Sequence, residues 1–192
     1  MLIREAMGVF WQTLKDTWEE LYMIAIVNLV WLFSWGAPIG LGYATQVPAL
    51  QAIGLLLGLL AFAITSVGVY YCTERVARGR TFSFADFREG IRLYWVKAIL
   101  WLLANLLIIG LFVMNIWFYP NAFEGAWVTL VVGVWIALLA LWVTAQIYFW
   151  PMMFQQVAPS MKLALKNAWF LMLANPFYAF FMLSFALVFL VL

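Results

Sequence analysis

Side chains that could carry out catalysis are few in this sequence and do not cluster. The chain has no histidine, which excludes a serine-histidine-aspartate triad and a histidine-ligated metal site. Its eight acids and its single cysteine, Cys72, form no pattern that brings an acid, a base and a nucleophile together. A lone cysteine also cannot form a disulfide within the chain. We therefore predict a protein that is not an enzyme and that holds no metal and no cofactor.

Side-chain amides are the remaining polar candidates in or beside long apolar stretches: Asn28, Gln46, Gln51, Asn105, Gln146, Gln155 and Gln156. Hydrogen bonding between helices explains each of them, because buried amides commonly join helices within a bundle. A sugar site would use amides together with aromatic rings, but the spacing shows no convergence. No charged residue lies in the middle of an apolar stretch, where a proton relay or an ion-coupling site normally requires one.

The composition indicates which elements hold these side chains. Apolar residues make up 68% of the chain and charged residues 9%, with a mean hydropathy of +1.03. A soluble domain of this size could not hide so much apolar surface from water. Because a helix needs about 20 apolar residues to cross the hydrocarbon, the uncharged stretches predict spans at about 21–43, 49–73, 98–119, 126–154 and 176–192. We expect an all-α integral membrane protein, a bundle of about five transmembrane helices with amphipathic cytoplasmic helices, as one membrane domain over residues 1–192.

The basic residues predict the orientation of these spans. All ten Lys and Arg lie before the first span, between the second and third, or after the fourth, and the alternate connections contain none. Short loops rich in Lys and Arg stay in the cytoplasm, so we expect a cytoplasmic amino terminus in a bacterial plasma (inner) membrane. Charged residues interrupt the first 20 positions, which argues against a cleavable signal peptide. The chain stops at Leu192 within apolar sequence, and we expect it to continue or to have been truncated there.

The cytoplasmic segments have apolar residues at helical spacing beside a charged face, which predicts amphipathic helices at about 1–20, 83–95 and 160–174. Ser83 and Asp86 have the spacing of a capping box at the start of the second. Asn175 and Pro176 either begin the last span or kink one long helix. The helices either lie among anionic lipid headgroups or dock a partner. The basic residues that would serve either role are Arg75, Arg78, Arg80, Arg88, Arg92, Lys162 and Lys166. A pI near 8.8 and a net charge of +2 give no support for nucleic-acid binding.

Small residues recur at spacings of four and three in two of the expected spans. Such stripes let helix backbones approach closely, either within one bundle or between two copies in a homo-oligomer. The candidate helix-packing residues are Gly54, Gly58, Ala61, Thr65 and Gly68 in the second span, and Thr129, Gly133, Ala137, Ala140 and Thr144 in the fourth.

Several short motifs resemble the YesL-like family of bacterial multipass membrane proteins of unknown function. They are Asn28–Val30 with Trp31, Leu32, Pro38 and Ile39; Gly79, Phe84, Phe87 and the run from Arg88 to Trp95; and Tyr148 to Pro151, followed by Leu165, Lys166, Asn167, Ala168, Asn175 and Pro176. The resemblance covers most of the chain. It implies a protein often encoded beside sugar-uptake and polysaccharide-degradation systems, and it implies no active site.

These observations favour a non-enzymatic accessory of bacterial carbohydrate uptake that contacts an ABC-type sugar permease through its cytoplasmic face. One alternative is a small transporter or channel subunit in which the second and fourth spans line a path for a neutral solute. Another is a structural homo-oligomer.

Overall fold

The computed structural model describes residues 11, 18, 21–179, 181 and 184, and every regular element there is a helix. The expected amphipathic helix at 1–20 and most of the expected span at 176–192 lie outside the described residues. Contacts divide the chain into two compact units, Met1–Leu102 and Leu103–Leu192. Each unit is described by itself.

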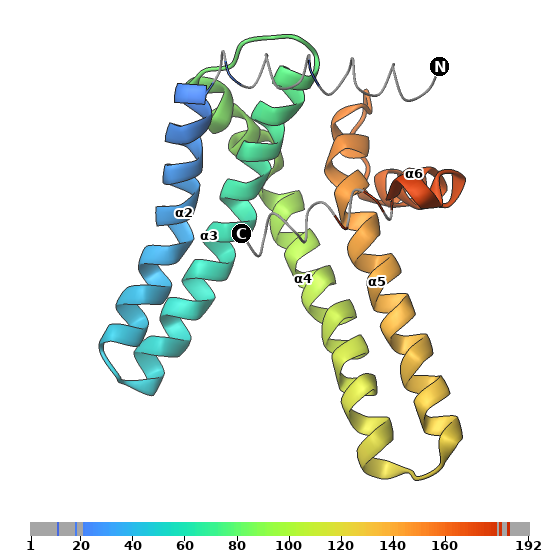
Figure 1. The fold of residues 1–192 in the computed structure, drawn as a ribbon. Coiled ribbons are helices and arrows are strands. Elements are labelled where there is room, and N and C mark those ends of the chain that lie inside the picture. Colours follow the sequence, from blue (N-terminus) through green and yellow to red (C-terminus); the bar gives the residue numbers. More distant parts are fainter. Residues whose placement is uncertain (1–10, 12–17, 19–20, 180, 182–183, 185–192) are drawn as a thin grey trace. The chain divides into compact units, whose positions relative to one another are not determined.

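In the first unit, α2 (Leu21–Ala44) and α3 (Pro48–Ala77) form an antiparallel hairpin (Figure 1). The turn between them contains Gln46 in the left-handed region, with φ of 54°, and Pro48 begins α3 at a position where no backbone donor is needed. Close to the turn, Gly42 and Gly54 face each other so tightly that a Cβ added to Gly54 would lie 3.0 Å from the Cα of Gly42. The absence of side chains here lets the two backbones touch.

The next helix, α4 (Phe84–Ala122), joins the amphipathic segment expected at 83–95 to the span expected at 98–119 in one element of 39 residues. Neither glycine nor proline lies between Trp95 and Ala98, so nothing in the sequence ends the helix at the membrane boundary. At 1.5 Å per residue α4 is about 58 Å long, almost twice the thickness of the hydrocarbon. Its first turns therefore extend out of the membrane without a break.

In the second unit, α5 (Ala126–Phe154) follows a turn at Gly125, where φ is 109°, and covers the stretch expected at 126–154. It packs against the later part of α4 through ring contacts such as Phe112 with Trp135, whose centroids are 5.9 Å apart. The shorter α6 (Met161–Ala174) lies across α5 (Figure 1). It ends at Asn175, and residues 176–179 are again helical, so Pro176 begins a new helical segment and α6 does not run through it.

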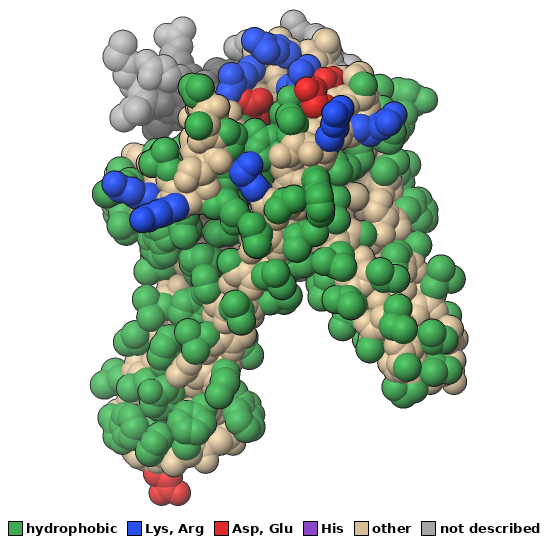
Figure 2. Space-filling model, turned by 180° about the vertical axis from the view of Figure 1, so that it is seen from behind, with side chains coloured by type: hydrophobic (Ala, Val, Ile, Leu, Met, Phe, Trp, Pro, Cys, Tyr) green, Lys and Arg blue, Asp and Glu red, His purple; other side chains and the backbone are tan. Residues whose placement is uncertain are grey.

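Four helices, α2 to α5, are long and apolar enough to cross a membrane. Their large side chains face outward: Leu41, Leu107 and Leu130 are each at least 70% exposed. Hydrophobic side chains cover most of the surface visible in Figure 2. Because water cannot solvate such a surface, the expected all-α membrane fold is confirmed.

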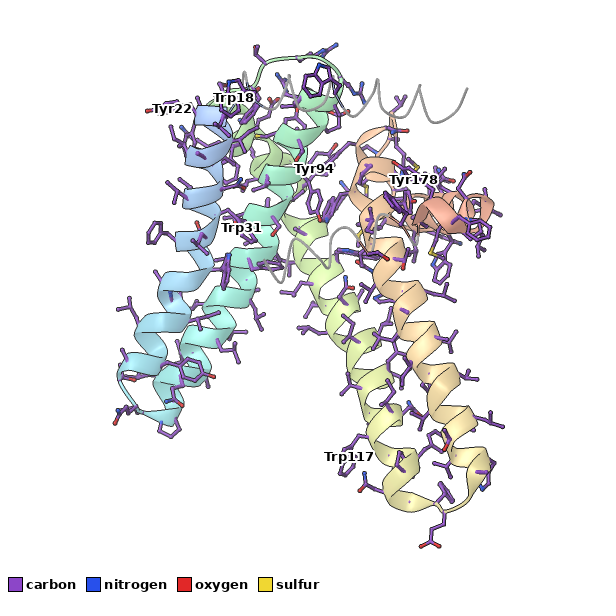
Figure 3. The ribbon with its side chains drawn as sticks, in the orientation of Figure 1. Trp18, Tyr22, Trp31, Tyr94, Trp117 and Tyr178 are labelled. Atoms are coloured by element: carbon purple, nitrogen blue, oxygen red, sulfur yellow. The ribbon has the colours of Figure 1, made fainter. Side chains whose placement is uncertain are left out.

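Aromatic residues bracket the apolar part of α4, with Tyr94 near its start and Trp117 near its far end (Figure 3). Their separation along the helix corresponds to about 35 Å, which is close to the thickness of the hydrocarbon. Such rings prefer the headgroup level, so they indicate where α4 enters and leaves the membrane.

Candidate functional site

Charged residues gather where α3 ends and α4 begins, a region we call the α3–α4 junction (residues 74–92). It contains five arginines and three acids. Two close approaches fix its geometry. A Cβ added to Gly68 would meet the ring of Phe87 at 2.7 Å, and one added to Gly90 would meet Cβ of Tyr71 at 2.6 Å. The start of α4 therefore lies directly on the end of α3, with Phe87 buried beside Val27 and Cys72.

The end of α3 is closed by a Schellman motif. The Gly79 N–H donates to the carbonyl of Val76 at 2.8 Å, and the Arg80 N–H donates to the carbonyl of Arg75 at 3.0 Å. Gly79 has a φ of 67°, which glycine adopts without strain. This turn directs the chain from α3 into the short connection that leads to α4.

Asp86 links the two helices at the junction. Its carboxylate accepts from the backbone N–H of Ser83 at 2.7 Å and from the Ser83 hydroxyl at 2.9 Å, and it pairs with Arg75 at 2.9 Å. The expected capping box is thus present on its acid side, with Asp86 reaching back to the backbone of Ser83. Burial raises the pKa of the Asp86 carboxyl, but the hydrogen bonds from Ser83 and the charge of Arg75 outweigh burial and hold the pKa below its usual range.

The five arginines of the junction fall into two groups. Arg75 pairs with Asp86, and Arg78 pairs with Glu74 one turn before it. Arg80, Arg88 and Arg92 are exposed, and none of them has a carboxylate within ion-pair distance among the described residues. In Figure 2, carboxylates lie among the basic side chains at this end of the first unit. The junction therefore holds a partly neutralised pair of arginines beside three exposed ones that have no carboxylate partner among the residues that the structure describes.

The chain matches no protein-family model, no curated protein and no solved structure. The resemblance to the YesL-like family therefore rests on the motifs quoted above. The geometry of the described residues carries the functional argument that follows.

The two small-residue stripes differ in their surroundings. In α3, Gly54 and Gly58 lie against α2, where an added Cβ on Gly58 would meet Cγ1 of Ile39 at 2.5 Å, and Gly68 lies against α4. Ala61 and Thr65 are partly buried between these contacts. This stripe lines the packing of the first unit.

In α5 the stripe faces away from α4. Thr129, Gly133, Ala137 and Ala140 are exposed, and an added Cβ on Gly133 would meet no atom within 4 Å. Only Thr144, in the carboxyl-terminal half of α5, is buried, and its hydroxyl donates to the carbonyl of Ala140 at 2.8 Å. The contact between α4 and α5 includes the rings of Phe112 and Trp135.

Three amides of the second unit have separate hydrogen-bond partners. Asn105 in α4 accepts from Nε1 of Trp142 in α5 at 3.0 Å, so it joins two helices. Gln146 donates to a carbonyl of its own helix, and Gln156 accepts from the backbone N–H of Ser160 at 2.8 Å beside the start of α6. These three amides serve packing and capping.

A second polar link between helices was not expected from the sequence. Nε1 of Trp31 in α2 donates to the Ser66 hydroxyl in α3 at 2.9 Å, and Trp31 is labelled in Figure 3. Small polar residues such as Ser66 are common hydrogen-bond partners between transmembrane helices, and this residue type was the only signal for the bond in the sequence.

Among the described residues no group of histidine, cysteine or acidic side chains could hold a metal.

The α6 helix carries the remaining basic candidates. Ala164, Ala168 and Met172 recur at every fourth position and are buried. Ala168 and Met172 form a buried cluster with Ala145 and Tyr148 of α5. Lys162 and Lys166 lie one turn apart on the exposed side, and Nζ of Lys166 lies 5.6 Å from the centre of the Phe170 ring. The basic candidates therefore belong to two elements, the α3–α4 junction of the first unit and α6 of the second.

Proposed function

We propose that this chain is a non-enzymatic accessory protein of bacterial carbohydrate uptake, which binds a membrane partner through the exposed arginines of the α3–α4 junction. The observation that carries the docking role is the fixed position of these arginines. Arg88 and Arg92 lie one turn apart on a helix that is fastened to α3 by the Gly68 and Gly90 contacts and by the pair between Arg75 and Asp86. A surface held in place before binding loses less entropy when a partner docks.

The chemistry of this surface favours an acidic partner. Arginine presents a planar fork of donors that suits carboxylates, and charge complementarity steers a partner to its site. The choice of an ABC-type sugar permease as that partner comes from the resemblance to the YesL-like family. The positive-inside rule places the junction, and the amino terminus with it, on the cytoplasmic side of a bacterial plasma membrane.

Co-purification after gentle detergent extraction tests this function. The sugar permease should be recovered with the wild-type chain and lost when Arg88→Glu and Arg92→Glu are combined. Lys162→Glu combined with Lys166→Glu is the matched control, because it makes the same change in charge on α6. Unchanged recovery with the Arg88 and Arg92 variant would reject the docking surface, and sugar flux in liposomes containing only this protein would favour a transporter.

A structural homo-oligomer is the second candidate, and the exposed stripe of α5 favours it. Gly133 and its neighbours allow another helix to approach closely, as small residues do at interfaces within membranes. Light scattering of the purified protein would give a mass above that of one chain, and Gly133→Leu would lower it. A mass of one chain for the wild type in mild detergent would count against this candidate.

A further inference from the structure

The two lysines of α6 have no acidic counterpart in their own unit. From Gly125 to the end of the sequence there is no Asp or Glu, and Lys162 and Lys166 are the only charged residues. The one acid of the second unit is Glu124, which precedes α5, whereas the lysines follow it. The 29 residues of α5 put about 43 Å between those two ends of the helix. Residues 103–192 therefore contain no Asp or Glu close to α6.

The exposed side of α6 also carries a strip of large apolar side chains beside the lysines. Leu163 is 44% exposed and Phe170 is 62% exposed. At 100° per residue they lie next to Lys162 and Lys166 around the helix, and away from the buried Ala168. The exposed side of α6 therefore carries the two lysines beside Leu163 and Phe170, while the buried side of the helix packs on α5.

The direction of α6 fits this division. It lies across α5, which is a membrane-spanning helix, so α6 runs closer to the plane of the membrane than to its normal (Figure 1). A helix in that position meets headgroups on one side and acyl chains on the other. The contact of Lys166 with the Phe170 ring places the ammonium group beside an exposed apolar side chain.

The α3–α4 junction differs from α6 in a way that separates their roles. At the junction, Asp86 and Glu74 neutralise two arginines, and the remaining charge is mixed in sign. On α6 the charge has one sign, and apolar side chains flank it. Mixed charge is suited to a protein partner, whereas lysines beside exposed apolar residues are suited to an anionic membrane surface.

We propose that α6 is a surface helix that binds anionic phospholipid headgroups through Lys162 and Lys166 while Leu163 and Phe170 enter the acyl-chain region. The lipid phosphates supply the negative charge that the second unit lacks. Binding would hold α6 in the headgroup layer and fix the position of the segment that begins at Pro176. This assignment goes beyond the proposed docking function and does not depend on it.

A fluorophore on α6 provides a local test in the full-length protein. An environment-sensitive label is attached to Leu173→Cys, which is on the exposed side of α6, in a Cys72→Ala background. Phosphatidylglycerol or phosphatidylcholine is then titrated into the delipidated protein in mild detergent. We expect a blue shift with phosphatidylglycerol at concentrations where phosphatidylcholine gives little response.

Three variants identify the groups responsible. Lys162→Gln with Lys166→Gln should weaken phosphatidylglycerol binding about fivefold for each lysine, up to about 30-fold for both. Lys162→Arg with Lys166→Arg should bind nearly as the wild type does, because the charges are kept. Arg88→Gln with Arg92→Gln removes the same charge from the junction and should leave the response of α6 unchanged.

Several results would overturn the assignment. They are wild-type affinity in the double glutamine variant, equal binding of phosphatidylcholine, and an equal loss of affinity in the Arg88 and Arg92 control. Competition with inorganic phosphate identifies the source of the anion. Displacement of the lipid by phosphate beyond the effect of chloride at equal ionic strength would indicate a site for free phosphate and would reject the lipid assignment.

Discussion

The guanidinium of Arg75 lies 2.9 Å from the carboxylate of Asp86, and this contact ties the last turn of α3 to the first turn of α4. Asp86 also accepts two hydrogen bonds from Ser83. One side chain thus closes the start of a helix and joins that helix to its neighbour. Asp86→Asn should therefore lower the stability of the junction by about 1–2 kcal/mol, because it removes the partly exposed ion pair and replaces charged hydrogen bonds from Ser83 with weaker neutral ones.

Thermal unfolding in mild detergent, followed by circular dichroism, would measure this loss. Glu89→Gln is the matched control, because it removes an acid from the same turn without touching Ser83. Equal melting temperatures for the Asp86 variant and the wild type would show that the contact contributes nothing to stability.

The same contact predicts a dependence on pH. The pKa of Asp86 is lower in the folded protein than its usual value, so the folded state keeps the carboxylate charged where the unfolded state has taken up a proton. Its contribution is complete above the unfolded pKa of about 3.9 and disappears as the pH falls through the lower folded value. The difference in melting temperature between wild type and Asp86→Asn should shrink below about pH 4. A difference that grew on acidification would contradict this assignment.

The close approach of α2 and α3 predicts that Gly54 cannot carry a side chain. An added Cβ would lie 2.4 Å from the carbonyl oxygen of Pro38 and 3.0 Å from the Cα of Gly42, and both contacts are with backbone, which cannot move aside as a side chain can. Gly54→Ala should cost about 1–3 kcal/mol through overpacking. Gly133→Ala is the control, because its Cβ would meet nothing within 4 Å and alanine favours a helix. Unfolding in detergent or mixed micelles compares the two, and equal stability would show that the hairpin tolerates a wider spacing.

These two glycines show how far the sequence predicts packing. The spacing of small residues correctly identifies faces that permit close approach, because that property depends only on the residues themselves. The partner of each face depends on tertiary arrangement, and Gly54 and Gly133 belong to similar patterns but have opposite surroundings. Nothing in either stripe distinguishes them.

The helices themselves were largely predictable for a physical reason. Backbone groups in lipid must be paired within the segment, so a long uncharged run becomes a helix whatever its neighbours are. The continuity of α4 was missed because the change from charged to apolar sequence near Lys97 marks a change of solvent, which does not end a helix. The ion pair of Arg75 with Asp86 was also missed, since it joins two helices across the turn at Gly79.

The bond between Trp31 and Ser66 should stabilise the α2–α3 hairpin by a measurable amount. Trp31→Phe and Ser66→Ala each remove the 2.9 Å hydrogen bond, and a double-mutant cycle isolates its contribution. Hydrogen bonds between transmembrane helices average about 0.6 kcal/mol and reach about 1.7 kcal/mol, so the coupling energy should fall in that range. Steric trapping or reversible unfolding in bicelles would give the four free energies. Additive effects of the two substitutions would mean that the bond contributes no net energy.

Because Arg88 and Glu124 lie at opposite ends of α4, we expect them to lie on opposite sides of the membrane. Arg88 lies in the first turns of this helix, and Glu124 follows its last residue, Ala122, beyond the apolar stretch. Single cysteines at these positions, each in a Cys72→Ala background, should react with a membrane-impermeant maleimide from different compartments. In intact cells Glu124→Cys should be labelled, whereas Arg88→Cys should be labelled only after the membrane is opened, because the positive-inside rule keeps the arginines in the cytoplasm. Lys162→Cys should behave as Arg88→Cys does, since an odd number of spans, α5, separates it from Glu124. Labelling of Arg88→Cys and Glu124→Cys from the same side would mean that α4 does not cross the bilayer, and the cytoplasmic placement of the junction would fall with it.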